Sequence, residues 1–418
     1  MGAGMAGHLT IDSGDTAWML VSTALVLMML LPGLALFYGG LVRAKNLLSV
    51  MSQALGIAAV AILVWIGWGY SLAFAGGNAL VGGLSKAGLA GIDGAATWAV
   101  PTEGEAIPEL LFVAFQMTFA AITAALIIGA LAERVRFSAI MLFTLLWLTI
   151  VYAPLAHMVW APEGFLFAFG AIDFAGGTVV HVNSGVAGLV GVYFAGSRIG
   201  HLKEAMPPHS LALTMVGAGL LWVGWFGFNA GSALEANGLA AIAMVNTFAA
   251  PAAGVLAWMG AERVVSGKPS MLGGASGAVA GLVAVTPAAG VSGPIGAMLL
   301  GAVASAACYG FVGSFKNRLR LDDSLDVFGI HGIGGIVGSI GTAFVALPML
   351  GGHGGTDYAL AGQVVRQLAA VGTAVAWSAA GSALCFAIVG RVTRLRHDRD
   401  REREGLDISD HGERAYNY

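Results

Sequence analysis

Long uninterrupted apolar runs, rather than alternating polar and apolar positions, dominate this chain of 418 residues. A helix needs about 20 apolar residues to cross the hydrocarbon core of a membrane. Ten runs between charged residues are that long: Thr16–Val42, Asn46–Ser85, Leu110–Ala132, Phe137–Pro162, Phe174–Ser197, Ala205–Leu234, Ala236–Ala261, Pro269–Phe315, Val327–Thr356 and Gln367–Gly390. Pro269–Phe315 is too long for one crossing, and "TPAAGVSGP" (Thr286–Pro294) holds the Pro and Gly residues that mark a turn. The pattern therefore predicts an all-α membrane protein with 11 transmembrane helices.

The composition agrees with a membrane location. Hydrophobic residues make up 57% of the chain and charged residues only 10%, whereas soluble domains carry about 25% charged residues. The 63 glycines suit helices that pack closely in lipid. A net charge of −3 argues against a nucleic-acid partner.

The basic residues predict the orientation of the chain. An odd number of spans puts the two termini on opposite sides of the membrane. With the N-terminus outside, 18 of the 20 Lys and Arg residues lie on the cytoplasmic side, and only Lys86 and Arg366 lie outside. Because cytoplasmic loops carry an excess of Lys and Arg, we expect the N-terminus outside and the C-terminus inside.

Two stretches of the chain resemble each other: "HVNSGVAGLVG" from His181 and "HGIGGIVGSIG" from His331. In both, Gly stands at the fourth, seventh and tenth positions after the histidine, and an Asp precedes it, Asp173 in one and Asp326 in the other. The histidines lie on spans 5 and 10, so their helices run in opposite directions. This pattern indicates an inverted repeat, although chance similarity is the alternative in a chain so rich in Gly.

The repeat predicts the domain organisation. We expect an extracytoplasmic N-terminus (1–15), a first five-span repeat (16–198), a second five-span repeat (199–356), an eleventh span (357–390) and a charged cytoplasmic tail (391–418).

The two repeated histidines are candidates for a functional site. His181 lies eight residues inside its span and His331 five residues beyond Asp326, which places them about 12 Å and 7.5 Å deep from opposite faces. Repeat-built transporters place their substrate sites near the midplane, and the Gly rows allow a direct contact between the two histidines. A buried structural pair is the alternative. A zinc site is disfavoured because no third ligand has a natural place at that depth, and we expect no metal and no cofactor.

Asp173 stands where its helix begins, and two roles explain an Asp at this position. An Asp at this position caps the helix and interacts favourably with its dipole. Its charge could also make the outer mouth attractive to cations. Both roles are compatible. The acidic group Asp322, Asp323 and Asp326 is expected to cap and order a cytoplasmic loop.

Aromatic residues gather at the outer ends of spans 3, 4 and 6, on the same side as Asp173. They are Phe115 and Phe119; Trp160; and Trp222, Trp225, Phe226 and Phe228, with Ser232 close by. An interfacial aromatic belt is one explanation. An aromatic cage with a hydroxyl acceptor, which holds a small ammonium-type cation, is the other.

At these residues the sequence resembles the ammonium transporter family (the Amt/Mep/Rh superfamily), and within it the bacterial and archaeal Amt type. The resemblance covers nearly the whole chain. It is carried by the stretches "ERVRFSAI", "AHMVW", "DFAGGTVVH", "GWFGFNAGSA" and "DVFGIHGIGGIVG". Rh-type relatives lack the tryptophan and serine of the outer site, and this chain has both.

The resemblance implies roles for the outer residues. Phe119, Trp160 and Ser232 would form the outer ammonium site, with Asp173 behind it in a partly structural role. Phe119 and Phe228 would be the stacked phenyl gate beneath that site.

The resemblance also implies roles deeper in the protein and in its assembly. His181 and His331 would be the twin histidines of the pore, and Trp225 would line it. The family further implies a homotrimer with one pore per subunit in the cytoplasmic membrane of a prokaryote, and a cytoplasmic PII-type protein that docks on the tail and inner loops.

The expected function is that of a transporter or channel and not of an enzyme. It would capture NH4+ (or methylammonium as an analogue), remove a proton and conduct NH3, with or without net proton transfer. K+ could enter the same cage but cannot lose a proton, so proton removal would distinguish the two ions. An ammonium sensor that signals through its tail is the alternative. A membrane hydrolase is disfavoured, since no nucleophile–base pair or three-ligand metal set is evident.

Overall fold

The computed structural model describes residues 9–355 and 358–417, and within these residues eleven helices are long and apolar enough to cross a membrane. The first five are Ser13–Leu41, with α1 (Ser13–Met28) and α2 (Ala35–Leu41); Ala44–Phe74, with α3 (Leu47–Val64) and α4 (Tyr70–Phe74); α5 (Glu109–Leu131); Phe137–Phe169, with α6 (Phe137–Trp147), α7 (Ala153–Trp160) and α8 (Phe165–Phe169); and Gly177–Ala195, with α9 (Asn183–Ala195).

The other six are α10 (Leu211–Gly231); α11 (Gly238–Ser266); Met271–Ala288, with α12 (Met271–Val285); Pro294–Arg318, with α13 (Pro294–Gly310) and α14 (Lys316–Arg318); Phe328–Val345, with α15 (Ile333–Val345); and α16 (Leu360–Val392). The predicted number of spans is confirmed, as is the break within Pro269–Phe315.

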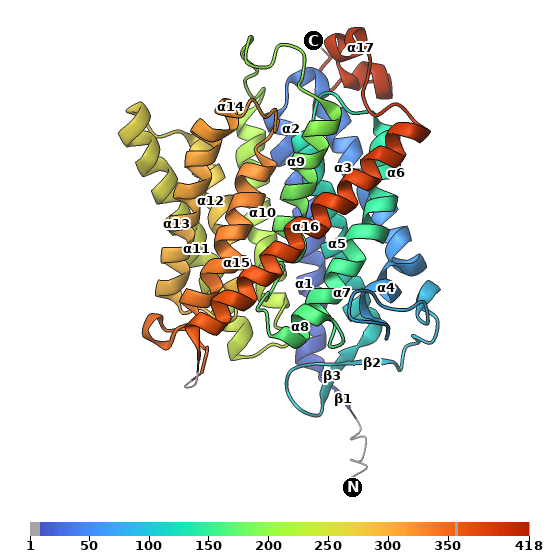
Figure 1. Cartoon of the computed structure of the whole chain (residues 1–418), viewed down its shortest axis with the longest axis vertical. Coiled ribbons are helices and arrows are strands. Elements are labelled where there is room, and N and C mark those ends of the chain that lie inside the picture. Colours follow the sequence, from blue (N-terminus) through green and yellow to red (C-terminus); the bar gives the residue numbers. More distant parts are fainter. Residues whose placement is uncertain (1–8, 356–357, 418) are drawn as a thin grey trace.

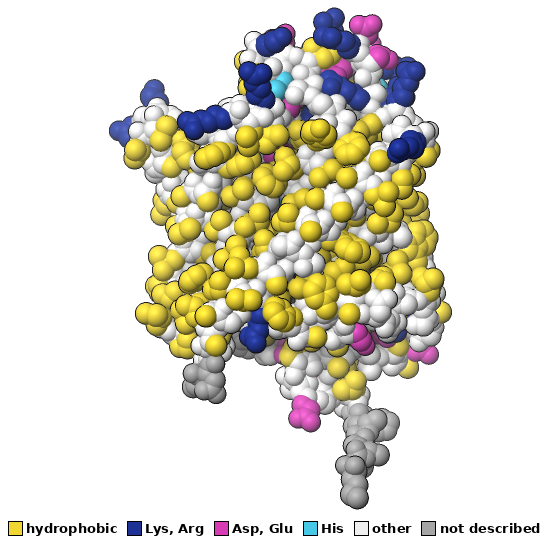
Figure 2. Space-filling view, viewed as in Figure 1, with side chains coloured by type: hydrophobic (Ala, Val, Ile, Leu, Met, Phe, Trp, Pro, Cys, Tyr) yellow, Lys and Arg dark blue, Asp and Glu magenta, His cyan; other side chains and the backbone are white. Residues whose placement is uncertain are grey.

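The spans stand side by side in a bundle, and α16 crosses one side of it diagonally (Figure 1). The two ends of the chain lie at opposite ends of the bundle. We call the end that carries the strands the sheet face, and the end that carries the short helix α17 (Arg399–Glu404) the tail face. A broad apolar band surrounds the middle of the molecule, and Lys and Arg side chains gather at the tail face (Figure 2). This charge asymmetry is the one that the positive-inside argument uses.

A small sheet on the sheet face was not expected from the sequence. It consists of β1 (Thr10–Ile11), β2 (Thr97–Ala99) and β3 (Glu105–Pro108) in the order β1-β3-β2, with β1 parallel and β2 antiparallel to β3.

The second transmembrane helix is shorter than the apolar run that predicted it. The run extends over Asn46–Ser85, whereas the helix ends at Phe74. After the helix, Gly77 and Gly82 pair so closely that a Cβ on Gly77 would lie 2.4 Å from a backbone oxygen.

The histidine-bearing helices of spans 5 and 10 begin in the same way. The carboxylate of Asp173 accepts hydrogen bonds from the backbone N–H groups of residues 176–179. The carboxylate of Asp323 accepts them from residues 327–329. Each Asp stands eight residues before the histidine of its helix, and each helix starts with a π-helical segment. Since π-helical segments are rare and often lie at functional sites, this agreement supports the repeat.

The pairing of Asp173 with Asp326 was therefore wrong, because Asp323 is the counterpart. Asp326 forms an ion pair with Lys316 at the surface of the tail face instead. Adjacent acidic residues in "LDDSLD" hid the true spacing. The expectation that this acidic group caps and orders a loop is confirmed for Asp323.

The two helices cross at their glycines. A Cβ on Gly185 would lie 2.4 Å from the backbone nitrogen of Gly332, and a Cβ on Gly335 would lie 3.0 Å from that of Val182. These two contacts exchange when 150 is added to the residue numbers of one helix, as an inverted repeat requires. Only glycine permits this approach of the two backbones.

The structure places α16 at Leu360–Val392, which extends past the uncharged run Gln367–Gly390 at both ends. Arg residues are tolerated in the two parts of α16 that lie outside the uncharged run, because the charged ends of their long side chains reach water. The predicted boundary between the second repeat and the eleventh span, at residues 356 and 357, and the first eight residues of the predicted N-terminal segment lie outside the described residues.

Candidate substrate pathway

Three cavities follow one another through the bundle from the sheet face to the tail face. We call them the recess, the central cavity and the tail-face cavity, and their volumes are about 160, 10 and 200 Å³. The recess is lined by Phe74, Trp98, Phe112, Phe115, Gln116, Phe119, Trp160, Phe174, Ser232 and Leu234. Seven of these ten side chains are aromatic, so the recess is an aromatic pocket with few polar atoms.

The recess brings together three residues that the resemblance grouped. Phe119 lies on α5, Trp160 at the end of α7, and Ser232 directly after α10. The rings of Phe119 and Trp160 meet edge to face, with centroids 6.0 Å apart. This geometry presents ring surface to a small cation, as a cation–π site requires.

Two residues of the recess lining carry side-chain oxygen atoms that can accept hydrogen bonds. The hydroxyl of Ser232 donates to the carbonyl of Phe228 at 2.8 Å, so its lone pairs remain available. The side-chain Oε1 of Gln116 is buried and has no partner among the described residues. Gln116 was not predicted, because an amide between two phenylalanines on a helix carries no distinctive sequence signal.

Asp173 does not line the recess. Its carboxylate also accepts the hydroxyl of Thr178, so both oxygens are occupied at the start of the helix. Burial raises the pKa of the Asp173 carboxyl, and the hydrogen bonds from Thr178 and the neighbouring backbone oppose that rise. Its backbone carbonyl accepts the indole N–H of Trp160 at 2.9 Å. Asp173 therefore supports the recess by orienting Trp160, while its carboxylate caps the helix.

Two stacked rings separate the recess from the central cavity. Phe119 and Phe228 lie with centroids 4.0 Å apart and planes at 10°. Both side chains are fully buried, and Phe119 faces the recess while Phe228 faces the central cavity. The stacked rings therefore stand at the position that the resemblance assigns to the gate.

The central cavity is narrow and almost entirely apolar. Its lining residues are Met29, Leu34, Phe37, Ile122, Leu126, Val180, His181, Leu221, Trp225, Phe228, Val279 and His331. Its volume of about 10 Å³ is close to the minimum room for one water molecule. Only the two histidines in this lining are ionisable.

The histidines contact each other directly, as the glycine rows predicted. Their Nδ1 atoms are 3.2 Å apart and the ring centroids 5.3 Å apart. An Nδ1–Nδ1 hydrogen bond needs one ring to donate and the other to accept, so two neutral rings take opposite tautomers. One Nε2 is then a donor and the other an acceptor. The Nε2 of His181 is buried without a partner among the described residues.

Trp225 forms the wall beside this pair. Its ring stacks on His181 with centroids 5.5 Å apart, and its N–H donates to the hydroxyl of Thr286 at 2.9 Å. Trp222 and Phe226, which belong to the same aromatic cluster in the sequence, face α11 instead.

His157 was expected to reach water at the outer end of its span, and the structure places it elsewhere. It is fully buried, and its ring nitrogens lie 2.9 and 2.7 Å from the backbone oxygens of Ala73 and Asn78. It lines none of the three cavities and joins α7 to the end of α4.

The fold and this path together define a class of protein: a multi-pass membrane transporter for a very small substrate. Comparison with known proteins identifies the family. A model described as "Ammonium Transporter Family" matches residues 17–416. The chain belongs to the ammonium transporter family.

The relatives are similar over nearly their whole length. The ammonium transporter of Aquifex aeolicus is 46% identical, with 99% of this chain and 95% of that protein covered. The ammonium transporter of Bacillus subtilis is 44% identical, with 97% and 99% covered. Among solved structures, Saccharomyces cerevisiae Mep2 has a TM-score of 0.85 at 36% identity, covering 94% of this chain and 90% of that chain. A structure titled "Sensor Amt Protein" has a TM-score of 0.86 at 26% identity, covering 95% and 98%.

Proposed function

We propose that this protein takes up ammonium: it captures NH4+ in the recess, removes one proton and conducts NH3 past the paired histidines. The observation that carries the proposal is the sequence of three cavities, in which an aromatic recess with free oxygen acceptors leads to a cavity with two histidines. The names of the relatives agree with this substrate.

Capture depends on replacing the hydration of the ion. A desolvated cation–π contact contributes about 2 kcal/mol or more, and Phe119 and Trp160 offer two rings. Ser232 and Gln116 add oxygen acceptors for the N–H groups. K+ could occupy the rings but could not donate hydrogen bonds to these oxygens.

Deprotonation provides the second selection. A charge near the centre of a bilayer costs several kcal/mol, whereas neutral NH3 avoids that cost. The unpartnered Nε2 of His181 accepts a hydrogen bond from the substrate, and the hydrogen bond between His181 and His331 offers a relay for the proton. K+ has no proton to lose and is rejected at this step.

We further propose that the sheet face lies outside, that the protein is a homotrimer in the cytoplasmic membrane, and that a PII-type protein docks on the tail face. The tail is already bonded to other residues there. The carboxylate of Glu402 accepts from the backbone N–H of Ile199, in the loop after α9, at 2.7 Å, and that of Asp407 accepts from the backbone N–H of Ser49, in the first turn of α3, at 2.8 Å. A partner that moved the tail would therefore act on that loop and on the start of α3.

An ammonium sensor is the second candidate, and the fold similarity to the structure titled "Sensor Amt Protein" favours keeping it. Uptake of labelled methylammonium into vesicles that contain the purified protein separates the two functions. A transporter accumulates the label, and excess ammonium suppresses that uptake. A sensor binds the label without carrying it inside, and this result would overturn the proposed transport.

A further inference from the structure

Three carboxylates meet on the sheet face, away from the path described above. They are Asp15 at the start of α1, Glu105 on β3, and Glu235 in the loop between α10 and α11. One oxygen from each lies within 4.8 Å of the others. Asp15 and Glu235 are buried, with 6% and 2% of their surfaces exposed. Such groups repel one another strongly when water is excluded.

The cluster has no balancing charge among the described residues. No Lys, Arg or His in residues 9–355 and 358–417 forms an ion pair with any of the three carboxylates. Hydrogen bonds satisfy part of the need, since Asp15 accepts from the backbone N–H of Ala236, and Glu235 accepts from the backbone N–H of Thr102 and from the side-chain amide of Asn237. The Oδ2 atom of Asp15, however, is buried without a hydrogen-bond partner in these residues. A buried, unpaired carboxylate oxygen in a group of acids needs a proton or a cation.

We infer that Asp15, Glu105 and Glu235 bind one Ca²⁺ ion. Ca²⁺ takes six to eight oxygen ligands at about 2.3–2.6 Å, so ligands on opposite sides of it are about 4.6–5.2 Å apart. Three oxygens that all lie within 4.8 Å of one another can share one such ion. Zinc is disfavoured because the cluster offers no nitrogen or sulfur ligand, and Mg²⁺ because it demands a tighter octahedral shell. Backbone carbonyls or water complete the coordination.

The position of the site gives the ion a structural consequence. It ties the sheet and the start of α1 to the loop that follows α10, and Ser232 of the recess stands three residues before Glu235. Strand β3 leads directly into α5, which carries Gln116 and Phe119. Bound Ca²⁺ therefore holds together the segments from which the recess is built.

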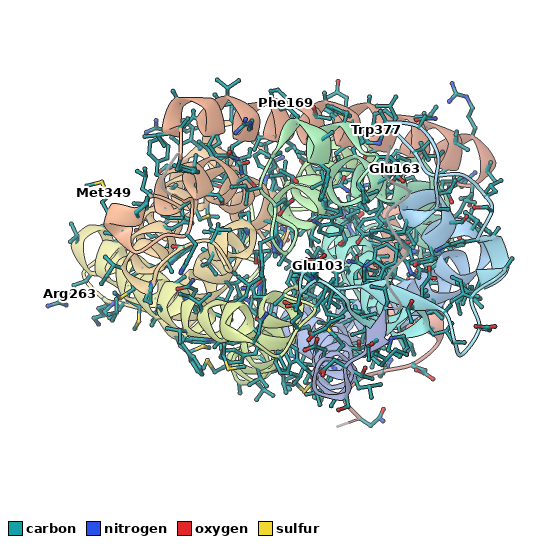
Figure 3. All side chains as sticks on the ribbon, turned by 90° about the horizontal axis from the view of Figure 1, so that it is seen from below. Glu103, Glu163, Phe169, Arg263, Met349 and Trp377 are labelled. Atoms are coloured by element: carbon teal, nitrogen blue, oxygen red, sulfur yellow. The ribbon has the colours of Figure 1, made fainter. Side chains whose placement is uncertain are left out.

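The test uses the full chain, purified in detergent and freed of metal with a chelator. We compare the native protein with Glu235→Gln, which keeps the shape of the side chain, and with Glu103→Gln as a matched control. Glu103 is exposed two residues before Glu105 on the same face (Figure 3). Binding is measured by equilibrium dialysis with ⁴⁵Ca²⁺ up to millimolar concentrations, and stability by the midpoint of thermal unfolding.

We expect one Ca²⁺ per chain and a raised midpoint for the native protein and for Glu103→Gln, with a smaller shift in Mg²⁺. Glu235→Gln should lose both responses. Without metal, its midpoint should equal or exceed the native value, because a repulsion is removed, and this shows that it folds. If Glu235→Gln does not fold, Asp15→Asn decides the matter by the same readouts. Absence of stoichiometric Ca²⁺ binding to the native protein, or an unchanged response in the substituted proteins, would overturn the inference.

Discussion

Two side chains of the recess lining carry oxygen atoms that can still accept a hydrogen bond. Ser232 uses its hydrogen on the carbonyl of Phe228, and its lone pairs remain available to accept. Gln116 keeps a buried oxygen without a partner in the described structure. A pocket that holds N–H groups has to leave acceptors unpaired when it is empty, and that lowers the stability of the empty protein.

Ser232→Ala should weaken the apparent affinity for ammonium. Hydrogen bonds to charged groups contribute about 1.5–3 kcal/mol, so we expect a loss of about tenfold to a hundredfold. Ser232→Thr keeps the hydroxyl and serves as the control. Concentration dependence of methylammonium uptake measures both proteins, and equal affinities for Ser232→Ala and the native chain would exclude the hydroxyl from the site.

The roles of individual residues were only partly predictable from the sequence. The histidine pair could be predicted because both residues begin the same glycine pattern. Asp173 could not be assigned, since a helix cap and a cation attractor need the same residue type at the same place. The direction of its carboxylate shows the cap, and only the folded backbone of residues 176–179 reveals that direction.

Among the elements, the crossing of spans 5 and 10 determines the geometry of the site. The glycine rows allow two backbones to touch, and this contact brings His181 and His331 into hydrogen-bond distance. The element pattern was visible in the sequence because glycine at a regular spacing is a property of the helix itself.

Gly185→Ala should therefore disturb the pathway from a position that contacts no substrate. The new Cβ would lie 2.4 Å from Gly332, and overpacking of this kind costs about 1–3 kcal/mol. We expect a lower thermal midpoint and reduced uptake. Gly219→Ala on α10 is the control, because its Cβ would meet nothing within 4 Å. Native stability and uptake in Gly185→Ala would contradict the close crossing.

The loops of the tail face are joined by a buried ionic network. Asp322 binds the guanidinium of Arg198 at 2.7 Å, and Arg198 also pairs with Glu133 at 3.3 Å. Arg134 is fully buried and donates to the backbone carbonyl of Asp322 at 2.8 Å. Burial alone would raise the pKa of Asp322, but Arg198 and Arg134 outweigh it and hold that pKa at about 2.

Asp322→Asn should destabilise the protein by about 3–5 kcal/mol at pH 7, because it removes the buried carboxylate that pairs with Arg198. The ordinary pKa of an Asp is 3.8, and the folded value is lower, so the ionised form stabilises the fold above pH 4 and this contribution is lost as the pH falls toward 2. The difference in the free energy of unfolding between the native protein and Asp322→Asn should shrink by about 2 kcal/mol over that interval. Unfolding of both proteins in detergent at several pH values measures this difference.

The control for this experiment is Asp326→Asn. Asp326 forms an ion pair with Lys316 that is more exposed than the pair between Asp322 and Arg198. Exposed pairs contribute about 0–1 kcal/mol, so its effect should be small and change little with pH. A difference between native protein and Asp322→Asn that is independent of pH would contradict the assigned pairing.

At the level of elements, the spans were predictable and the sheet was not. Length and apolarity determine a membrane helix, whereas β1 and β2 have only two and three residues and form by pairing with β3 across the chain. The turn that ends α4 was likewise hidden, because Gly and Ala in residues 75–83 read as a continuation of the apolar run. The Asp323 cap was missed because three acidic residues compete within five positions.

The whole molecule separates its charges between two faces, and the proposed sidedness depends on that separation. Lys and Arg gather with the tail (Figure 2), and the sheet face holds the recess. Two exposed residues suit a test: Glu163 on the sheet face, labelled in Figure 3, and Glu404 at the end of α17.

Glu163→Cys should react in intact cells with a thiol reagent that cannot cross membranes, and Glu404→Cys should react only after the cells are opened. The two natural cysteines are buried, so the unsubstituted chain is the background control. The opposite labelling pattern would place the tail outside and reverse the direction in which the recess faces.

In the proposed function, selection by proton removal depends on the whole path, because the rings of the recess and the histidines of the central cavity would act one after the other. The most direct measurement compares NH4+ and K+ entry into vesicles that contain the protein, with internal dyes for pH and for K+. We predict that NH4+ changes the internal pH faster than in protein-free vesicles, while K+ enters no faster than without protein. Entry of K+ at a rate comparable to that of ammonium would contradict the account.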